Sequence, residues 1–160
     1  MHHGLMSRRR HWGGFGGFEE FISERSGILS RSELLHAGWT PDELRIAFGL
    51  GNLRRLRRGW YRSSDVPPEV VRAWQHGGPL ACVSALRWYG VTPLDVSEVD
   101  DGVLHICLPR HTHRRRIECP DPGPVVVHWD DAGESPRALW AVPPDVAFAQ
   151  ARHCTAARRA

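Results

Sequence analysis

The sequence predicts an α+β protein in which a winged helix-turn-helix is followed by a small mixed α/β module. Two capped helical segments lie close together before residue 51, and an arginine-rich stretch with a hairpin pattern follows them directly. Apolar runs at residues 102 to 109 and 124 to 129 are typical of strands. We expect four regions, namely a flexible basic tail (1–14), the winged helix-turn-helix (15–65), the α+β module (66–156) and a frayed end (157–160).

The first half of the chain carries the signals of three short helices. Phenylalanines and an isoleucine recur at helical spacing between residues 15 and 25. Ser30 with Glu33, and Thr40 with Glu43, each form the capping-box pattern that begins a helix. Two short helices joined by a turn that contains glycine are typical of a helix-turn-helix. We expect the third helix to turn its apolar side chains to the core: Leu44, Ala47 and Phe48.

The stretch LRRLRRGWYR, residues 53 to 62, predicts a β-hairpin with its turn at Arg58 and Gly59. Because side chains alternate along a strand, we expect Leu56 and Tyr61 on one face and Arg55, Arg57, Trp60 and Arg62 on the other. Between Glu43 and Asp65 the chain has six arginines and no acidic residue. This concentration of charge favours contact with a polyanion.

Double-stranded DNA is the polyanion that the helix-turn-helix pattern favours. The hairpin would lie along the phosphates, the third helix would enter the major groove, and Trp60 would stack or enter the minor groove. The alternative is a solvated edge hairpin whose charges prevent aggregation. The candidate DNA-binding residues are Arg31, Thr40, Arg45, Arg54, Arg55, Arg57, Arg58, Trp60 and Arg62.

The composition of the whole chain excludes several chemistries. All 21 basic residues are arginine, so no lysine is present for a Schiff base or a phosphate loop. The net charge of +3 is only mildly basic, so the distribution of charge matters more than its total. No apolar run approaches the roughly 18 residues of a membrane span, and no signal peptide is recognisable. We expect a cytoplasmic protein, with Met6 as a second candidate for the native start.

The segment RHTHRRR, which follows the first strand of the second module, predicts a second basic patch. An exposed loop without a partner is the alternative. The residues of this patch are Arg110, His111, His113, Arg114, Arg115 and Arg116.

Histidines and cysteines between residues 105 and 128 are potential metal ligands. They are His105, Cys107, His111, His113, Cys119 and His128. The arginines around His111 and His113 would repel a cation, and the four cysteines, which include Cys82 and Cys154, form no CxxC pair. We therefore expect buried reduced thiols, no metal and no cofactor.

The candidates for catalysis are also weak. The aspartate pairs at residues 100–101 and 130–131 lie beside Gly or Ala-Gly, where such pairs commonly mark turns. Ser84 lacks the glycine elbow of a hydrolase nucleophile. We expect a protein that is not an enzyme.

From about residue 18 to residue 155 the chain resembles the N-terminal region of AbiEi-family antitoxins of type IV toxin-antitoxin systems. The same region heads many Vsr-like endonucleases. The resemblance is carried by ILSRSELLHAGWTPDELRIAFGLGNLRRLRRGWYR, VSALRWYGV, LHICLPR and VVVHW. It implies a winged helix-turn-helix that binds DNA and, in the antitoxins, represses their own promoter. The chain departs from the pattern at Trp60 and at Cys82-Val83, and it stops near the point where relatives continue into a longer C-terminal domain.

We therefore expect a DNA-binding transcriptional regulator, with autoregulation as in the antitoxins that the chain resembles. A cognate toxin is a second candidate partner, and a homodimer on an inverted repeat is expected because one module buries little surface on DNA. Two alternatives remain open. One is a protein-interaction module that binds a toxin or another partner; the other is a truncated or accessory part of a Vsr-like endonuclease.

Overall fold

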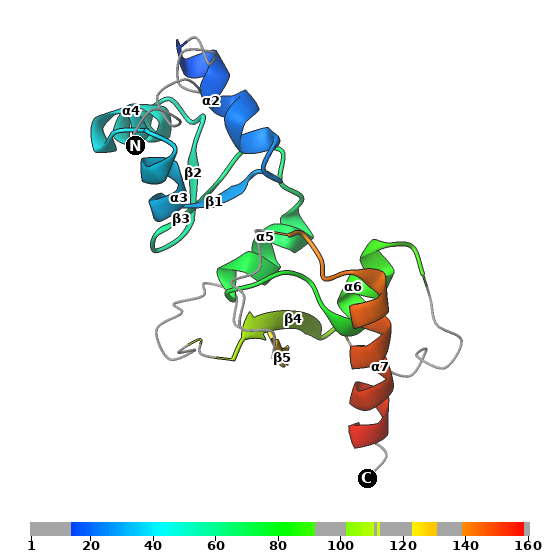
Figure 1. The fold of residues 1–160 in the computed structure, drawn as a ribbon. Helices are drawn as coiled ribbons and strands as arrows, with labels where there is room; N and C mark the ends of the chain where they lie inside the picture. The colour runs from blue at the N-terminus through cyan, green and yellow to red at the C-terminus, as the bar shows by residue number, and fades with distance from the viewer. Residues whose placement is uncertain (1–13, 92–101, 111, 113–122, 131–138, 159–160) are drawn as a thin grey trace, which may run out of the picture. The chain divides into compact units, whose positions relative to one another are not determined.

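The computed structural model of the chain describes residues 14–91, 102–110, 112, 123–130 and 139–158. The chain forms two compact units, the first ending at Pro67 and the second beginning at Pro68. Within the described residues the protein is mixed α+β, with six helices, one three-stranded sheet and one two-stranded sheet (Figure 1). The expected α+β class is confirmed.

The first unit begins with a helix, α2 (Gly14–Ser23), and continues with a short strand, β1 (Ile28–Ser30). Two helices follow, α3 (Arg31–His36) and α4 (Pro41–Gly49). The unit ends with the hairpin strands β2 (Arg54–Arg57) and β3 (Trp60–Arg62). The sheet is antiparallel with the order β1-β3-β2, so the hairpin is extended by a strand that lies far from it in the sequence.

Both predicted capping boxes are confirmed. The Glu33 N–H donates to Ser30 Oγ at 3.1 Å, and the Ser30 N–H donates to Glu33 Oε2 at 2.7 Å. Thr40 and Glu43 make the same two bonds at the start of α4, at 3.3 and 2.8 Å. Each pair satisfies two backbone donors that a helix start would otherwise leave without an intrahelical acceptor.

The core of the first unit is an apolar cluster drawn from α2, β1, α3 and α4, together with Leu53 before β2. Its buried members are Phe18, Phe21, Ile22, Leu29, Leu34, Leu44, Ala47 and Leu53. Trp39 packs edge-on against Phe18, with ring centroids 4.5 Å apart. The expectation that Phe48 faces this core is wrong, since its side chain is 52% exposed. Ala47 and Phe48 are about 100° apart around a helix, and the core lies on the Ala47 side, where the Leu53 N–H bonds the Ala47 carbonyl.

The hairpin has the predicted turn, in which Gly59 takes a φ of 77° that favours glycine. A register shift between Arg55 and Arg57 interrupts the ladder, so Arg55 lies opposite Tyr61 and Arg57 lies opposite Trp60. Directly opposed residues share a face of an antiparallel sheet. The predicted placement of Arg55 with Trp60 and Arg62 is therefore wrong, because strict alternation does not continue through a bulge.

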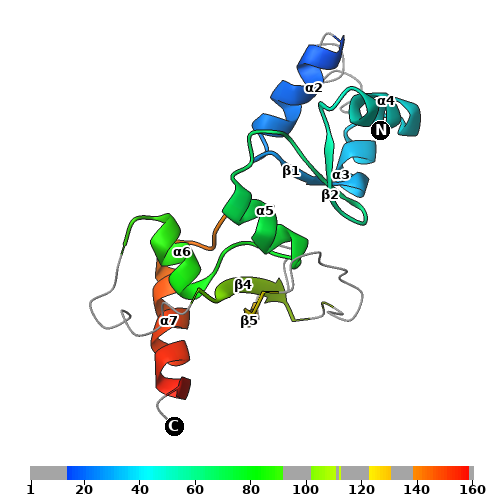
Figure 2. The same cartoon turned by 180° about the vertical axis from the view of Figure 1, so that it is seen from behind.

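The second unit contains α5 (Pro68–Gln75), α6 (Cys82–Trp88), β4 (Leu104–Pro109), β5 (Val125–Asp130) and α7 (Pro144–Arg158). Strands β4 and β5 pair in parallel, with Leu104 opposite Val125 and Cys107 opposite His128. Helices α6 and α7 lie side by side, and α6 also contacts β4 (Figure 2). Helix α6 thus packs against both α7 and β4, which are far apart in the sequence.

Close backbone packing fixes the entry into α6. A side chain at Gly78 would collide with the carbonyl oxygen of Cys107, so this position requires glycine. Leu80 then bridges to Ile106 on one side and to Ala141 on the other. Among the described residues, no helix has the length and apolar character needed to cross a membrane.

Candidate functional site

The first candidate site is the arginine hairpin, residues 53 to 62. Arg54, Arg55 and Arg58 are exposed, whereas Arg57 and Arg62 are half-buried. The backbone N–H of Arg31, the first residue of α3, donates to the Gly59 carbonyl at 2.8 Å. This bond ties the start of α3 to the tip of the hairpin. The structure thereby places Arg31, an exposed member of the predicted DNA-binding set, beside this tip.

Like charges face each other across the hairpin. Arg54 lies directly opposite Arg62 in the ladder. Burial, followed by the charge of Arg54, lowers the pKa of Arg62 from its ordinary value. Opposed like charges destabilise a strand pair. This arrangement therefore lowers the stability of the hairpin unless an anion binds nearby.

Arg57 and Trp60 form a contact of their own. The Arg57 guanidinium lies 4.9 Å from the centroid of the Trp60 ring, within the range of a cation–π interaction. Burial lowers the pKa of Arg57. Both side chains therefore have a packing role in the hairpin, and the predicted contact of Trp60 with DNA stays a prediction.

On α4, the predicted base-reading residues already have partners within the protein. Thr40 closes the capping box, and Arg45 Nη2 lies 3.0 Å from Asp42 Oδ1. Both members of this ion pair are more than three-quarters exposed, so the pair is weak and can be exchanged for another partner. Arg45 remains available to a ligand at small cost, whereas Thr40 is needed for the helix start.

The predicted second basic patch falls mostly outside the described residues. Arg110 follows β4 and is exposed. The other members lie outside the described part of the chain: His111, His113, Arg114, Arg115 and Arg116. Of the two aspartate pairs, only Asp130, the last residue of β5, is described.

The second unit contains a Cys/His cluster that consists of Cys82, His105, His128 and Cys154. One potential ligand atom from each residue lies within 4.8 Å of the corresponding atoms of the other three. The residues come from α6, β4, β5 and α7 respectively. His105 and His128 belong to the set of potential ligands considered from the sequence, whereas the two cysteines were assigned there to buried reduced thiols.

The two imidazoles are the closest members of the cluster. His105 Nδ1 lies 3.2 Å from His128 Nε2, and the rings are stacked with centroids 5.5 Å apart. Cys154 Sγ lies 4.0 Å from the same Nδ1 atom. Cys82 and His105 are completely buried. Burial also lowers the pKa of His128, which favours its neutral form.

Neighbouring polar groups hold the backbone of the cluster in place. The Cys82 N–H donates to Gln150 Oε1 at 2.9 Å, and the His105 N–H donates to Ser84 Oγ at 3.0 Å. Gln150 lies one turn before Cys154 on α7, so both side chains face the sheet. Ser84, considered as a nucleophile from the sequence, has a structural role here.

Cys107 lies beside the Cys/His cluster without belonging to it. It shares a face of the sheet with His105, two residues earlier on β4. Its Sγ accepts a hydrogen bond from Gln150 Nε2 at 3.7 Å, and burial raises the pKa of the thiol. Cys107 is therefore a buried reduced thiol, as expected.

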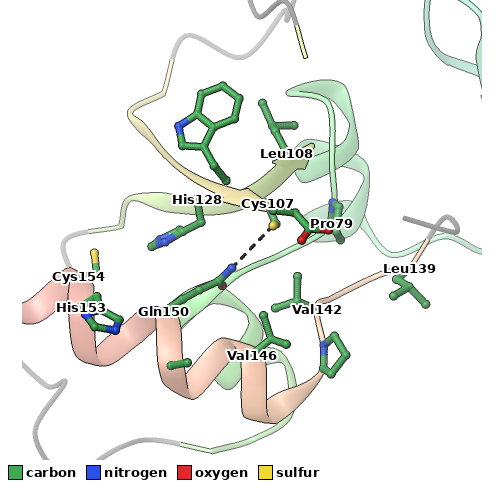
Figure 3. A pocket seen from close by; sticks show the side chains of 14 residues that line it. Pro79, Cys107, Leu108, His128, Leu139, Val142, Val146, Gln150, His153 and Cys154 are labelled. Atoms are coloured by element: carbon green, nitrogen blue, oxygen red, sulfur yellow. Dashed lines mark hydrogen bonds between the residues drawn. The ribbon is translucent and has the colours of Figure 1, made fainter. Parts of the chain in front are cut away.

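An apolar hollow of about 740 Å³ adjoins the Cys/His cluster. Figure 3 shows that His128 and Cys154 point toward each other at one end, while Leu139, Val142 and Val146 lie toward the other end. Half of the cluster is thus reachable from this hollow, and the other half is enclosed.

Comparison with known proteins assigns the chain to no family. Neither a protein-family model nor a curated protein matches the sequence.

Proposed function

We propose that the protein binds double-stranded DNA through its first unit and regulates transcription, as the antitoxins that it resembles do. The observation that carries the proposal is the arginine hairpin, in which Arg54 opposes Arg62. Between Glu43 and Asp65 the sequence contains six arginines and no acidic residue. Phosphates would supply the missing anions, because guanidinium groups bind phosphate oxygens strongly.

The order of the elements supports a winged helix-turn-helix as the DNA-binding fold. A helix, a short strand, two capped helices and a hairpin follow one another, and β1 pairs with the second hairpin strand. In such a fold α4 would enter the major groove and the arginine hairpin would be the wing. The bond from Arg31 to Gly59 would hold the wing beside the start of α3.

The charges of this unit suggest how affinity and specificity are divided. The three exposed hairpin arginines would contact phosphates, which position a protein on DNA without reading its sequence. Base reading would fall to Arg45, once it leaves Asp42 for a guanine edge. We therefore propose that the hairpin contributes most of the affinity and α4 contributes the discrimination between sequences.

Fluorescence anisotropy tests this proposal with a duplex from upstream of the gene and a scrambled duplex. The test variant carries Arg54→Ala, Arg55→Ala and Arg58→Ala, which removes the exposed hairpin charges and leaves Arg57 on Trp60. We expect the wild type to prefer the upstream duplex and the variant to bind both duplexes far more weakly.

A matched control removes three exposed arginines from the second unit, Arg72, Arg87 and Arg152. It changes the net charge by the same amount, so a loss confined to the hairpin variant assigns binding to the hairpin. Equal losses of affinity in both variants would mean that the net charge of the protein, rather than the hairpin, determines binding. If the hairpin variant bound the duplexes as tightly as the wild type does, the proposal would be overturned.

A protein partner is the second candidate function, favoured by the apolar hollow of the second unit. Trp129 is 47% exposed and Leu139 is 39% exposed beside this hollow. A cognate toxin is the partner that the resemblance would suggest. This candidate predicts equally weak binding of both duplexes and no effect of the hairpin variant.

A further inference from the structure

The Cys/His cluster of the second unit contains the side chains that zinc prefers. Two thiolates and two imidazoles form one of the common donor sets of structural zinc sites. Soft thiolates together with imidazoles favour zinc over magnesium or calcium, which prefer oxygen donors. We infer that Cys82, His105, His128 and Cys154 bind one zinc ion.

Two distances within the cluster are close to those of a tetrahedral site, and all four ligand atoms lie within 4.8 Å of one another. With Zn–N near 2.05 Å and Zn–S near 2.3 Å, tetrahedral geometry places two nitrogens about 3.4 Å apart and a nitrogen and a sulfur about 3.6 Å apart. The nitrogens of His105 and His128 are 3.2 Å apart, and Cys154 Sγ is 4.0 Å from the His105 nitrogen. Shifts of a few tenths of an ångström bring these three atoms onto one ion.

Two hydrogen bonds from backbone N–H groups hold the chain around the ligands. Ser84 accepts from the His105 N–H, and Gln150 accepts from the Cys82 N–H. Cys82 also has a φ of 49°, a left-handed conformation that costs free energy in a residue other than glycine. Strained conformations of this kind cluster at ligand sites. The fold thus holds Cys82 in a position that its backbone alone would not favour.

The arrangement is that of a structural site. All four tetrahedral positions are filled by protein, whereas catalytic zinc sites keep one position for water or substrate. The ion would join α6, β4, β5 and α7, which are distant in sequence. His128 and Cys154 line the apolar hollow and provide the entry path, while Cys82 and His105 are enclosed.

Two other states of the same residues make different predictions. In one, the imidazoles share a hydrogen bond and both thiols stay reduced, so the purified protein contains no metal. In the other, Cys82 and Cys154 form a disulfide under oxidising conditions, which mass spectrometry detects as the loss of two hydrogens. Either state in the freshly purified protein would overturn the inference.

The test is the metal content of the full chain, produced without a histidine tag and purified under reducing conditions. Inductively coupled plasma mass spectrometry should find about one zinc per chain after dialysis against metal-free buffer. Cobalt that replaces the zinc should give the intense visible bands of tetrahedral coordination and a thiolate-to-cobalt charge-transfer band. Absence of both signals from the folded protein would contradict the inference.

Two cysteine substitutions localise the ion. Cys154→Ser should lower zinc affinity at least tenfold and weaken the thiolate-to-cobalt band. Cys107→Ser is the matched control, because Cys107 is a neighbouring buried thiol bonded to Gln150 and lies outside the cluster. It should keep one zinc per chain. Zinc retained with unchanged affinity in Cys154→Ser would overturn the inference.

Zinc binding can also be tested without any variant, in case the Cys154→Ser protein does not fold. The wild-type chain can be stripped with a chelator and titrated with zinc against a competing dye, while circular dichroism records its secondary structure. Saturation at one equivalent supports the site, and no uptake by a chain that retains its secondary structure contradicts it. None of these readouts involves DNA, so they are independent of the proposed function.

Discussion

The two units of this protein differ in where their candidate functional side chains lie, exposed on a hairpin in the first and wholly or partly buried in the second. The first encloses an apolar cluster and displays its arginines on the hairpin, where Arg54 faces Arg62. The second gathers two cysteines and two histidines into one cluster, in which Cys82 and His105 are completely buried. We propose that the exposed charge of the first unit serves binding, and that the Cys/His cluster of the second unit holds a metal that stabilises the fold.

The largest effect is expected in the apolar core of the first unit. Leu34 is completely buried, so Leu34→Ala should lower the free energy of unfolding of this unit by about 2–5 kcal/mol. Urea unfolding followed by tryptophan fluorescence measures the loss. Leu50→Ala is the control, because Leu50 is 62% exposed and its truncation should cost little. Similar losses from both variants would mean that this cluster is not the core.

Removal of metal should affect the second unit instead. An ion present at 100 to 1,000 times its dissociation constant stabilises the folded state by about 3–4 kcal/mol. Chelation should therefore speed hydrogen exchange in β4, β5 and α7 and leave exchange in α2 to α4 unchanged. Hydrogen exchange by mass spectrometry resolves the two units. Equal acceleration in both units would contradict the contrast between them.

The capping boxes should contribute less. Thr40→Ala removes the side-chain acceptor of the Glu43 N–H at the start of α4, which should cost about 1 kcal/mol. Thr40→Ser keeps a hydroxyl and should restore most of the stability. Thermal unfolding of the three proteins checks this order. If the serine variant were as unstable as the alanine variant, the lost methyl group rather than the cap would explain the effect.

The smallest effect on stability, with the opposite sign, is expected at Arg54. Arg54→Ala removes a repulsive partner of Arg62, so the first unit should gain about 0.2–1 kcal/mol. The same change should weaken DNA binding. A residue that costs stability and contributes binding has a functional rather than a structural role. A loss of stability in Arg54→Ala, measured by urea unfolding, would remove this argument.

The local patterns of the first unit were predictable from its sequence. Both capping boxes and the turn at Gly59 depend on residues within a few positions of one another. The errors arose where strand pairing and packing override the local pattern. β1 was missed because Ile28–Ser30 becomes a strand only by pairing with β3, and Phe48 was misplaced because Leu53 determines which side of α4 is buried.

The Cys/His cluster shows the same limit more strongly. Its residues lie on four separate elements, and no short spacing links Cys82 or Cys154 to the histidines. The potential ligands considered from the sequence included His105 and His128 because they lie within one 24-residue span. The cysteines become their neighbours only when α6 and α7 pack beside the parallel pair β4 and β5.

The salt dependence of DNA binding tests the central claim most directly. Each phosphate contact contributes about −0.9 to the slope of log affinity against log salt concentration, so four or five contacts give a slope near −4. The variant with Arg54→Ala, Arg55→Ala and Arg58→Ala should have a slope shallower by about 2.7. The control without Arg72, Arg87 and Arg152 should keep the wild-type slope. An unchanged slope in the hairpin variant would contradict the assignment of phosphate binding to the arginine hairpin.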